Sequence, residues 1–219
     1  MIPTVTRNAR EETLNSLDRL PASLSRVLIS SICVLLIAPV GAVALLSGAG
    51  MIRLPVEMFL LAERAPIIFR LHMLSGAAAL LLLPITIYFR HRPDLHRALG
   101  RTLGGFVVVG GLTALPVAVL SQSAPLARAG FFAQGLVWLW LLGQGWIAIR
   151  RGQRARHARY MIGLAAVTTG AVWFRLMTGA ALYFHLPFEQ TYIFAAWAGW
   201  LIPLCAVWIA ARLGGSLLH

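Results

Sequence analysis

Two arginine-rich segments each bring one histidine to the start of an apolar run. They are RHRPDLHRALGR at residues 90–101, which contains His96 and Arg101, and RRGQRARHARYM at residues 150–161, which contains His157. A histidine nitrogen can ligate haem iron, and neighbouring arginines can bind the haem propionates. His96 and His157, with Arg101, therefore form one candidate cofactor site, for haem b. Against it, both histidines stand at loop edges, whereas the ligands of a membrane haem usually lie within helices.

A second candidate site lies inside two other apolar runs. His72, in IIFRLHMLSG, is six positions after Pro66, and Arg175, in GAVWFRLMTG, is nine positions before Phe184. At 1.5 Å per helical residue these side chains start roughly 9 Å and 13 Å below the same membrane face. Burying an arginine costs roughly 2.5–3.5 kcal/mol on insertion scales, so such a residue indicates function. A neutral His72 could accept a hydrogen bond from Arg175 or share an anion with it.

The depth of His72 depends on where its helix begins. If the helix begins at Leu71 instead of Pro66, His72 lies at the membrane interface and needs no functional explanation. A haem site on this side would need His185 as the second ligand, and His185 falls at the outer end of its own run. The spacing of these two histidines does not favour such a pair.

The composition is that of a membrane protein. Of the 219 residues, 59% are hydrophobic and 12% are charged, and the mean hydropathy is +0.78. A transmembrane helix needs about 20 apolar residues to cross a hydrocarbon core of about 30 Å. We predict an all-α integral membrane protein whose six transmembrane helices form one bundle, at residues 27–46, 66–89, 102–120, 131–149, 160–184 and 192–211. This domain, residues 27–212, follows a polar arm of residues 1–26 and precedes a tail of residues 213–219.

The arginines indicate the orientation of this bundle. All nineteen basic residues are arginines, and the net charge is +12. Cytoplasmic loops are enriched in basic residues near the helix ends. With both termini in the cytoplasm, the inner segments hold fourteen arginines and the outer segments four. We therefore predict cytoplasmic N- and C-termini, and arginines that face anionic lipid headgroups, with no nucleic acid partner.

Other polar and small residues within the runs predict helix packing. We expect four polar residues to join helices through hydrogen bonds, namely Gln134, Gln144, Thr168 and Thr169. Small residues four positions apart, such as Ser75 with Ala79, fit close helix contacts. Cys33 and Cys205 lie within apolar runs, where neither a disulfide nor a zinc site is expected.

Several function classes are disfavoured by the sequence. No aspartate or glutamate lies within a predicted span, which argues against proton-coupled transport through a carboxylate relay. The chain has no nucleotide-binding loop, nucleophile elbow or H-E-x-x-H zinc helix, so a conventional kinase or hydrolase is not expected.

These residues, in this order, resemble a known family over about residues 66–210. It is the bacterial family of predicted membrane proteins termed domain of unknown function 2306. The matching positions are His72, His96, Arg97, Gly100, Arg101, Trp138, His157, Met161 and Arg175. Tyr160 and Phe174 depart mildly from the pattern, which has Trp and Leu there. The resemblance implies a multi-pass protein of a bacterial inner (plasma) membrane and supplies no activity.

Three hypotheses about function are compatible with the sequence. The first is electron transfer by haem b or a quinone. The second is binding or transport, without redox chemistry, of an anionic or lipid-like ligand at His72 and Arg175. The third is a structural role, as an assembly factor or partner of a larger membrane-protein complex.

Overall fold

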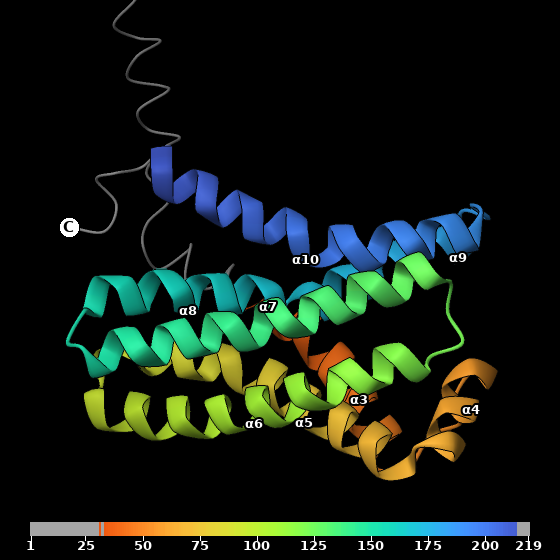
Figure 1. Cartoon of the computed structure of the whole chain (residues 1–219), viewed down its shortest axis with the longest axis horizontal. Coiled ribbons are helices and arrows are strands. Elements are labelled where there is room, and N and C mark those ends of the chain that lie inside the picture. Colours follow the sequence, from red (N-terminus) through yellow and green to blue (C-terminus); the bar gives the residue numbers. More distant parts are fainter. Residues whose placement is uncertain (1–30, 32, 214–219) are drawn as a thin grey trace, which may run out of the picture.

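The structure is a computed structural model that describes residue 31 and residues 33–213. Every element that these residues form is a helix, and the long helices lie side by side in an elongated bundle (Figure 1). The elements are the π-helix η1 (Cys33–Ile37), α3 (Ala38–Gly48), α4 (Val56–Arg64), α5 (Pro66–Tyr88), the 3₁₀-helix η2 (Phe89–His91), α6 (Pro93–Leu120), α7 (Pro125–Arg150), α8 (Arg154–Thr168), α9 (Gly170–Tyr183) and α10 (Phe188–Leu213).

Five segments of the described chain are long and apolar enough to cross a membrane. They are α5 with η2, α6, α7, α8 with α9, and α10. These segments confirm the predicted all-helical, multi-pass class. At the predicted first span, the described residues hold a shorter apolar helix, Leu35–Gly48. The start of that span and the predicted arm lie outside the described residues, as does the tail after Leu213.

Several helices begin earlier than the apolar runs predict. α6 begins at Pro93, nine residues before the predicted span, and α7 begins at Pro125, six residues before. Proline is favoured in the first turn because its missing N–H has no helical partner there. His96 and His157 lie in the first turns of α6 and α8, close to the loop edges where the sequence placed them, and Arg101 lies further along α6. α5 begins at Pro66, so the alternative start at Leu71 is wrong.

The predicted fifth span is two helices, not one. α8 ends at Thr168, and the Val172 amide bonds to the carbonyl of Thr169, three residues back instead of four. The hydroxyls of Thr168 and Thr169 donate to the carbonyls of Leu164 and Ala166, at 2.7 and 2.8 Å. Threonines that bond back to their own helix bend it. The Thr-Thr-Gly sequence therefore accounts for a break in the middle of this span.

One half of the bundle is filled with buried side chains. α5 packs against α3 and α6, α7 against α6 and α8, and α10 against α7, α8 and α9. The largest cluster of buried residues comprises Ala79, Leu83, Leu103, Val107, Trp138, Leu141, Leu164, Val167, Trp200 and Leu204. Most of these residues lie toward the cytoplasmic end predicted from the sequence, and they fill that half with side chains.

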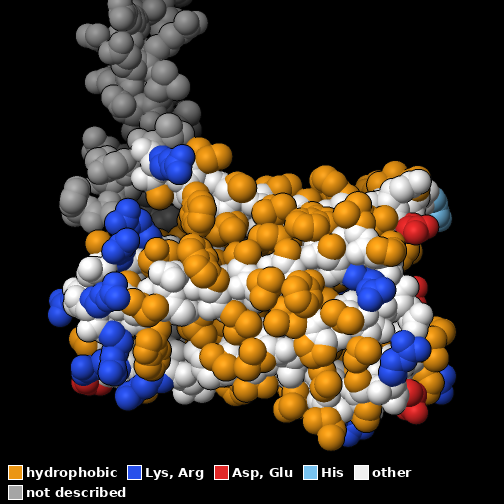
Figure 2. Space-filling model, in the orientation of Figure 1, with side chains coloured by type: hydrophobic (Ala, Val, Ile, Leu, Met, Phe, Trp, Pro, Cys, Tyr) orange, Lys and Arg blue, Asp and Glu red, His pale blue; other side chains and the backbone are white. Residues whose placement is uncertain are grey.

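Arginines gather at the same end of the molecule. Figure 2 shows them around the turns that join α5 to α6 and α7 to α8, at the left of the view. We call this end, with the turns at residues 89–92 and 151–153, the arginine-rich end. The end with the turns at residues 121–124 and 184–187 is the opposite end. The arginine-rich end also holds an exposed ion pair, Arg97 with Asp94 at 2.5 Å.

The close packing around the helix break requires a glycine at position 170. A Cβ atom there would lie 2.7 Å from Gln134 Nε2, 3.0 Å from Trp200 Cβ and 3.4 Å from Trp200 Cα. The main chain of α10 cannot move aside as a side-chain end can. Glycine at this position therefore allows α9 to approach both α7 and α10.

We predict that Gly170→Ala destabilises the protein by about 1–3 kcal/mol, because the added methyl group overpacks this contact. Gly179→Ala in the same helix is the matched control, since a Cβ there meets nothing within 4 Å. The control should stay within about 1 kcal/mol of the wild type. Thermal unfolding in detergent measures both variants, and equal midpoints would contradict the explanation.

Candidate functional site

A cavity of about 670 Å³ occupies the half of the bundle toward the opposite end. Its polar rim includes Arg53, Glu57 and Ser121, from the α3–α4 connection, α4 and the α6–α7 turn. Trp138 and Val167 line the cavity and also belong to the buried core. They form its floor, and the core beneath them separates the cavity from the arginine-rich end.

His72 lines the cavity from α5. Its Nδ1 lies 3.0 Å from the main-chain carbonyl oxygen of Gly110 in α6. A carbonyl can only accept, so Nδ1 carries the proton, and in the neutral ring Nε2 is an acceptor. Nε2 has no hydrogen-bond partner among the described residues. In the described part of the chain, every fully buried side-chain nitrogen has a hydrogen-bond partner. Since Nε2 of His72 has none, it is at least partly accessible.

Gly110 allows this arrangement. A Cβ atom at this position would lie 3.1 Å from the Trp138 ring and 3.2 Å from Ser75 Oγ. Ser75 is buried, and its hydroxyl donates to the carbonyl of Leu71. The predicted role of Ser75 in close helix packing agrees with this contact. The glycine lets both α5 and α7 lie close to α6 beside the cavity.

Arg175 lines the same cavity from α9, eight residues before Tyr183. Its guanidinium carbon lies 5.6 Å from the centroid of the Phe174 ring, within the range of a cation–π interaction. Within the described chain, no side-chain hydrogen bond or ion pair of Arg175 is found. His72 and Arg175 therefore line one cavity without bonding to each other, which leaves a shared ligand as the way they could act together.

An aromatic wall flanks Arg175. The rings of Phe131, Phe174 and Tyr192 meet edge to face, with centroids 5.0–5.9 Å apart, and all three residues line the cavity. They come from α7, α9 and α10, so the wall joins three helices. Edge-to-face rings add stability beyond their buried area. The wall presents flat apolar surface to whatever occupies the cavity.

Two side chains of α7 hold the helix break in place. Gln134 Nε2 donates to the Val167 carbonyl at 3.2 Å, and Trp138 Nε1 donates to Thr168 Oγ1 at 2.8 Å. The predicted interhelical bonds of Gln134 and Thr168 are thus present, whereas the Thr169 hydroxyl bonds to Ala166 in the same span and no such bond of Gln144 is found among the described residues. Because both α7 side chains line the cavity, Gln134 and Trp138 are also site residues, a role that the sequence reasoning did not assign. Gln134 Oε1 has no partner among the described residues.

The first candidate site is arranged differently. His96 Nδ1 lies 3.1 Å from the Thr86 carbonyl, and His157 Nδ1 lies 3.0 Å from the Gly145 carbonyl. Each histidine thus joins its helix to the preceding helix of the chain. Arg101 is exposed and donates from Nε to the carbonyl of Arg97 in its own helix.

His96 and His157 belong to different helix pairs, and neither lines the cavity. Their pairing as ligands of haem b stays a prediction. His185, considered as a partner for His72, is exposed in the turn after α9 and does not line the cavity either. Among the described residues, no group of three or more His, Cys, Asp and Glu side chains could hold a metal ion.

Comparison with known proteins places this arrangement in a family. A family model described as "Predicted membrane protein (DUF2306)" matches residues 69–210, more than half of the chain. No curated protein and no solved structure matches the chain. The matched region contains all of the candidate residues from His72 to Arg175. The chain therefore belongs to the DUF2306 family of predicted membrane proteins.

Proposed function

We propose that this membrane protein binds an amphipathic, lipid-like small molecule in the cavity, with His72 and Arg175 contacting its polar group. The observation that carries the proposal is the cavity itself. Its volume of about 670 Å³ falls within the range of small-molecule sites, and its lining is mostly apolar with a few polar groups. Both residues singled out by the cost of burying them in a membrane line its wall.

The free polar atoms specify the polarity of the ligand. Neutral His72 offers Nε2 as an acceptor, and Gln134 Oε1 is a second acceptor, so the ligand should present a hydroxyl or N–H group to them. Arg175 offers only donors and a positive charge, which favour an anionic or carbonyl oxygen. The aromatic wall of Phe131, Phe174 and Tyr192 suits a planar or unsaturated apolar body. The expected ligand combines these three features.

The filled half of the bundle favours binding over passage through the membrane. Trp138 and Val167 belong to both the cavity lining and the packed core, and among the described residues no residue of the turns at the arginine-rich end lines the cavity. In the described helices that could cross the membrane, the acidic residues Asp94 and Glu189 stand in first turns. A carboxylate relay for proton coupling has no residues there.

The orientation predicted from the arginines extends the proposal. With the arginine-rich end in the cytoplasm, six spans and both termini inside, the cavity rim faces the outer side of a bacterial inner membrane. A ligand would then enter from the outer leaflet or from the space outside it.

A redox version of the proposal is a quinone in the same cavity, since a quinone offers carbonyl oxygens and its reduced form offers hydroxyl donors. Electron transfer would need a second redox group. His96 and His157 each hold Nδ1 on a carbonyl and keep Nε2 for other partners, which is the arrangement typical of metal-ligating histidines. This observation keeps haem b as the second candidate.

The binding proposal predicts that Arg175→Leu weakens binding of a dansylated fatty acid at least about tenfold, a loss of about 1.4 kcal/mol. His72→Phe, which removes Nε2 and keeps an aromatic ring, should also weaken it. The affinities of wild type and Arg175→Leu for the uncharged methyl ester of the probe should differ much less, because the ester lacks the charge that Arg175 attracts. Energy transfer from the tryptophans of the protein, which include Trp138 in the cavity wall, to the dansyl group reports occupancy.

The matched control is Arg64→Leu, an exposed arginine of α4 that does not line the cavity. It should bind the probe as the wild type does. Wild-type affinity in both Arg175→Leu and His72→Phe would contradict the proposed site.

The haem hypothesis predicts a sharp b-type band in the reduced-minus-oxidised spectrum of protein expressed with ample haem. His96→Ala and His157→Ala should each abolish this band, because each would remove one axial ligand. A flat wild-type spectrum, or an unchanged band in both variants, would exclude the pair as haem ligands.

The orientation predicts which loops are accessible from outside the cell. In a variant without Cys33 and Cys205, a membrane-impermeant maleimide applied to intact cells should label Gln122→Cys and not Arg151→Cys. Permeabilised cells should show labelling of both, which controls for reactivity. Labelling of Arg151→Cys alone in intact cells would invert the topology.

A further inference from the structure

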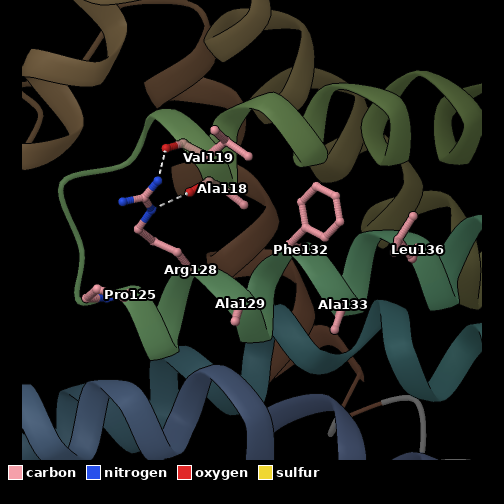
Figure 3. A pocket seen from close by; sticks show the side chains of 8 residues that line it. All are labelled: Ala118, Val119, Pro125, Arg128, Ala129, Phe132, Ala133 and Leu136. Atoms are coloured by element: carbon pink, nitrogen blue, oxygen red, sulfur yellow. Dashed lines mark hydrogen bonds between the residues drawn. The ribbon is translucent and has the colours of Figure 1, made fainter.

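A groove separate from the cavity lies between α6 and α7 near the opposite end. Its volume is about 540 Å³. Figure 3 shows Arg128 near the α6–α7 turn, with Phe132 and Leu136 following it along α7. Apart from Arg128, the lining side chains are apolar. A charged group therefore lies at one end of an apolar groove.

Arg128 caps the C-terminal end of α6. Its Nε donates to the Ala118 carbonyl at 3.3 Å, and Nη2 donates to the Val119 carbonyl (Figure 3). These carbonyls are among the last four of α6, which have no partner within the helix. This capping explains the position of the side chain. It does not neutralise the charge, because both acceptors are uncharged.

The positive charge of Arg128 has no protein counter-ion in the described chain. The ion pair found there joins Arg97 and Asp94, at the arginine-rich end. Nη1 of Arg128 has no hydrogen-bond partner among the described residues. The guanidinium therefore keeps both a charge and donors for an anion outside the protein.

The groove leads from this charge toward the middle of the bundle. Arg128 is three residues after the start of α7, about 4.5 Å along its axis, and Leu136 is about 12 Å further. Ala129 and Ala133 are short, so they leave space between the larger side chains. A cation near the helix end and an apolar channel below it match the order of a phospholipid, whose phosphate lies above its acyl chains.

We propose that this groove binds one anionic phospholipid, with its phosphate on Arg128 and one acyl chain beside Phe132 and Leu136. Charge-assisted hydrogen bonds from a guanidinium to phosphate are among the strongest in proteins. A net negative headgroup fits better than a zwitterionic one, because a choline cation would be repelled by Arg128. The proposal is independent of the ligand in the cavity.

The test compares bound lipid in protein reconstituted with equal amounts of phosphatidylglycerol and phosphatidylcholine. Native mass spectrometry after stepwise delipidation should find one tightly held phosphatidylglycerol on the wild type. Arg128→Gln should reduce its retention at least about fivefold. Arg64→Gln, which changes an exposed arginine away from the groove, should retain it.

A second variant separates binding from capping of α6. Ala133→Phe fills the groove and leaves the hydrogen bonds of Arg128 in place, so it should lose the lipid even if Arg128→Gln does not fold. Wild-type retention in Ala133→Phe would overturn the proposal. It would also be overturned if inorganic phosphate displaced the lipid or raised the unfolding midpoint as much as phosphatidylglycerol does, since the site would then recognise a free anion.

Discussion

The hydrogen bonds from α7 to the break between α8 and α9 support the hollow half of this bundle. A backbone group that loses its helical partner inside a membrane must find another, because lipid offers none. Gln134 bonds to the Val167 carbonyl, and Trp138 bonds to the side-chain hydroxyl of Thr168 beside it, so α7 holds the interrupted transmembrane helix at mid-depth. Broken helices of this kind line binding sites in many transporters. Here the same side chains that satisfy the break also line the cavity.

Three histidines also supply hydrogen-bond partners to main-chain carbonyls. His72, His96 and His157 each place Nδ1 on a main-chain carbonyl of a neighbouring helix, at 3.0–3.1 Å. Two of these bonds fasten helix pairs at the arginine-rich end, and the third lies beside the cavity. The contact fixes the ring in each case, and what differs is the surroundings of Nε2. Only for His72 is that atom placed where a cavity ligand could reach it.

Much of the fold could be predicted from hydropathy and charge, because a membrane-spanning helix must be long and apolar. That His72 and Arg175 share one site was a hypothesis based on the cost of burying them in lipid, and both residues line the same cavity. The break at Thr169 was missed, although the Thr-Thr-Gly run is a local signal for it. An interhelical bond of Gln134 could be predicted but its partner could not, because the Val167 carbonyl becomes available only when α7 and the break are packed together. The predicted span of residues 102–120 is shorter than α6 because the polar first turns of this helix lack the apolar signal.

Ala118 gives the two pockets of this molecule a common wall. It lines both the cavity and the groove, it is almost fully buried, and its carbonyl accepts from Arg128. The cavity inside the bundle and the groove between α6 and α7 thus share a residue of α6. If binding in one pocket displaced α6 and changed the affinity of the other, the second occupant would change the affinity of the first by the same factor, because thermodynamic linkage is reciprocal. The lipid composition of the surrounding bilayer would in this way adjust how strongly the interior site holds its ligand.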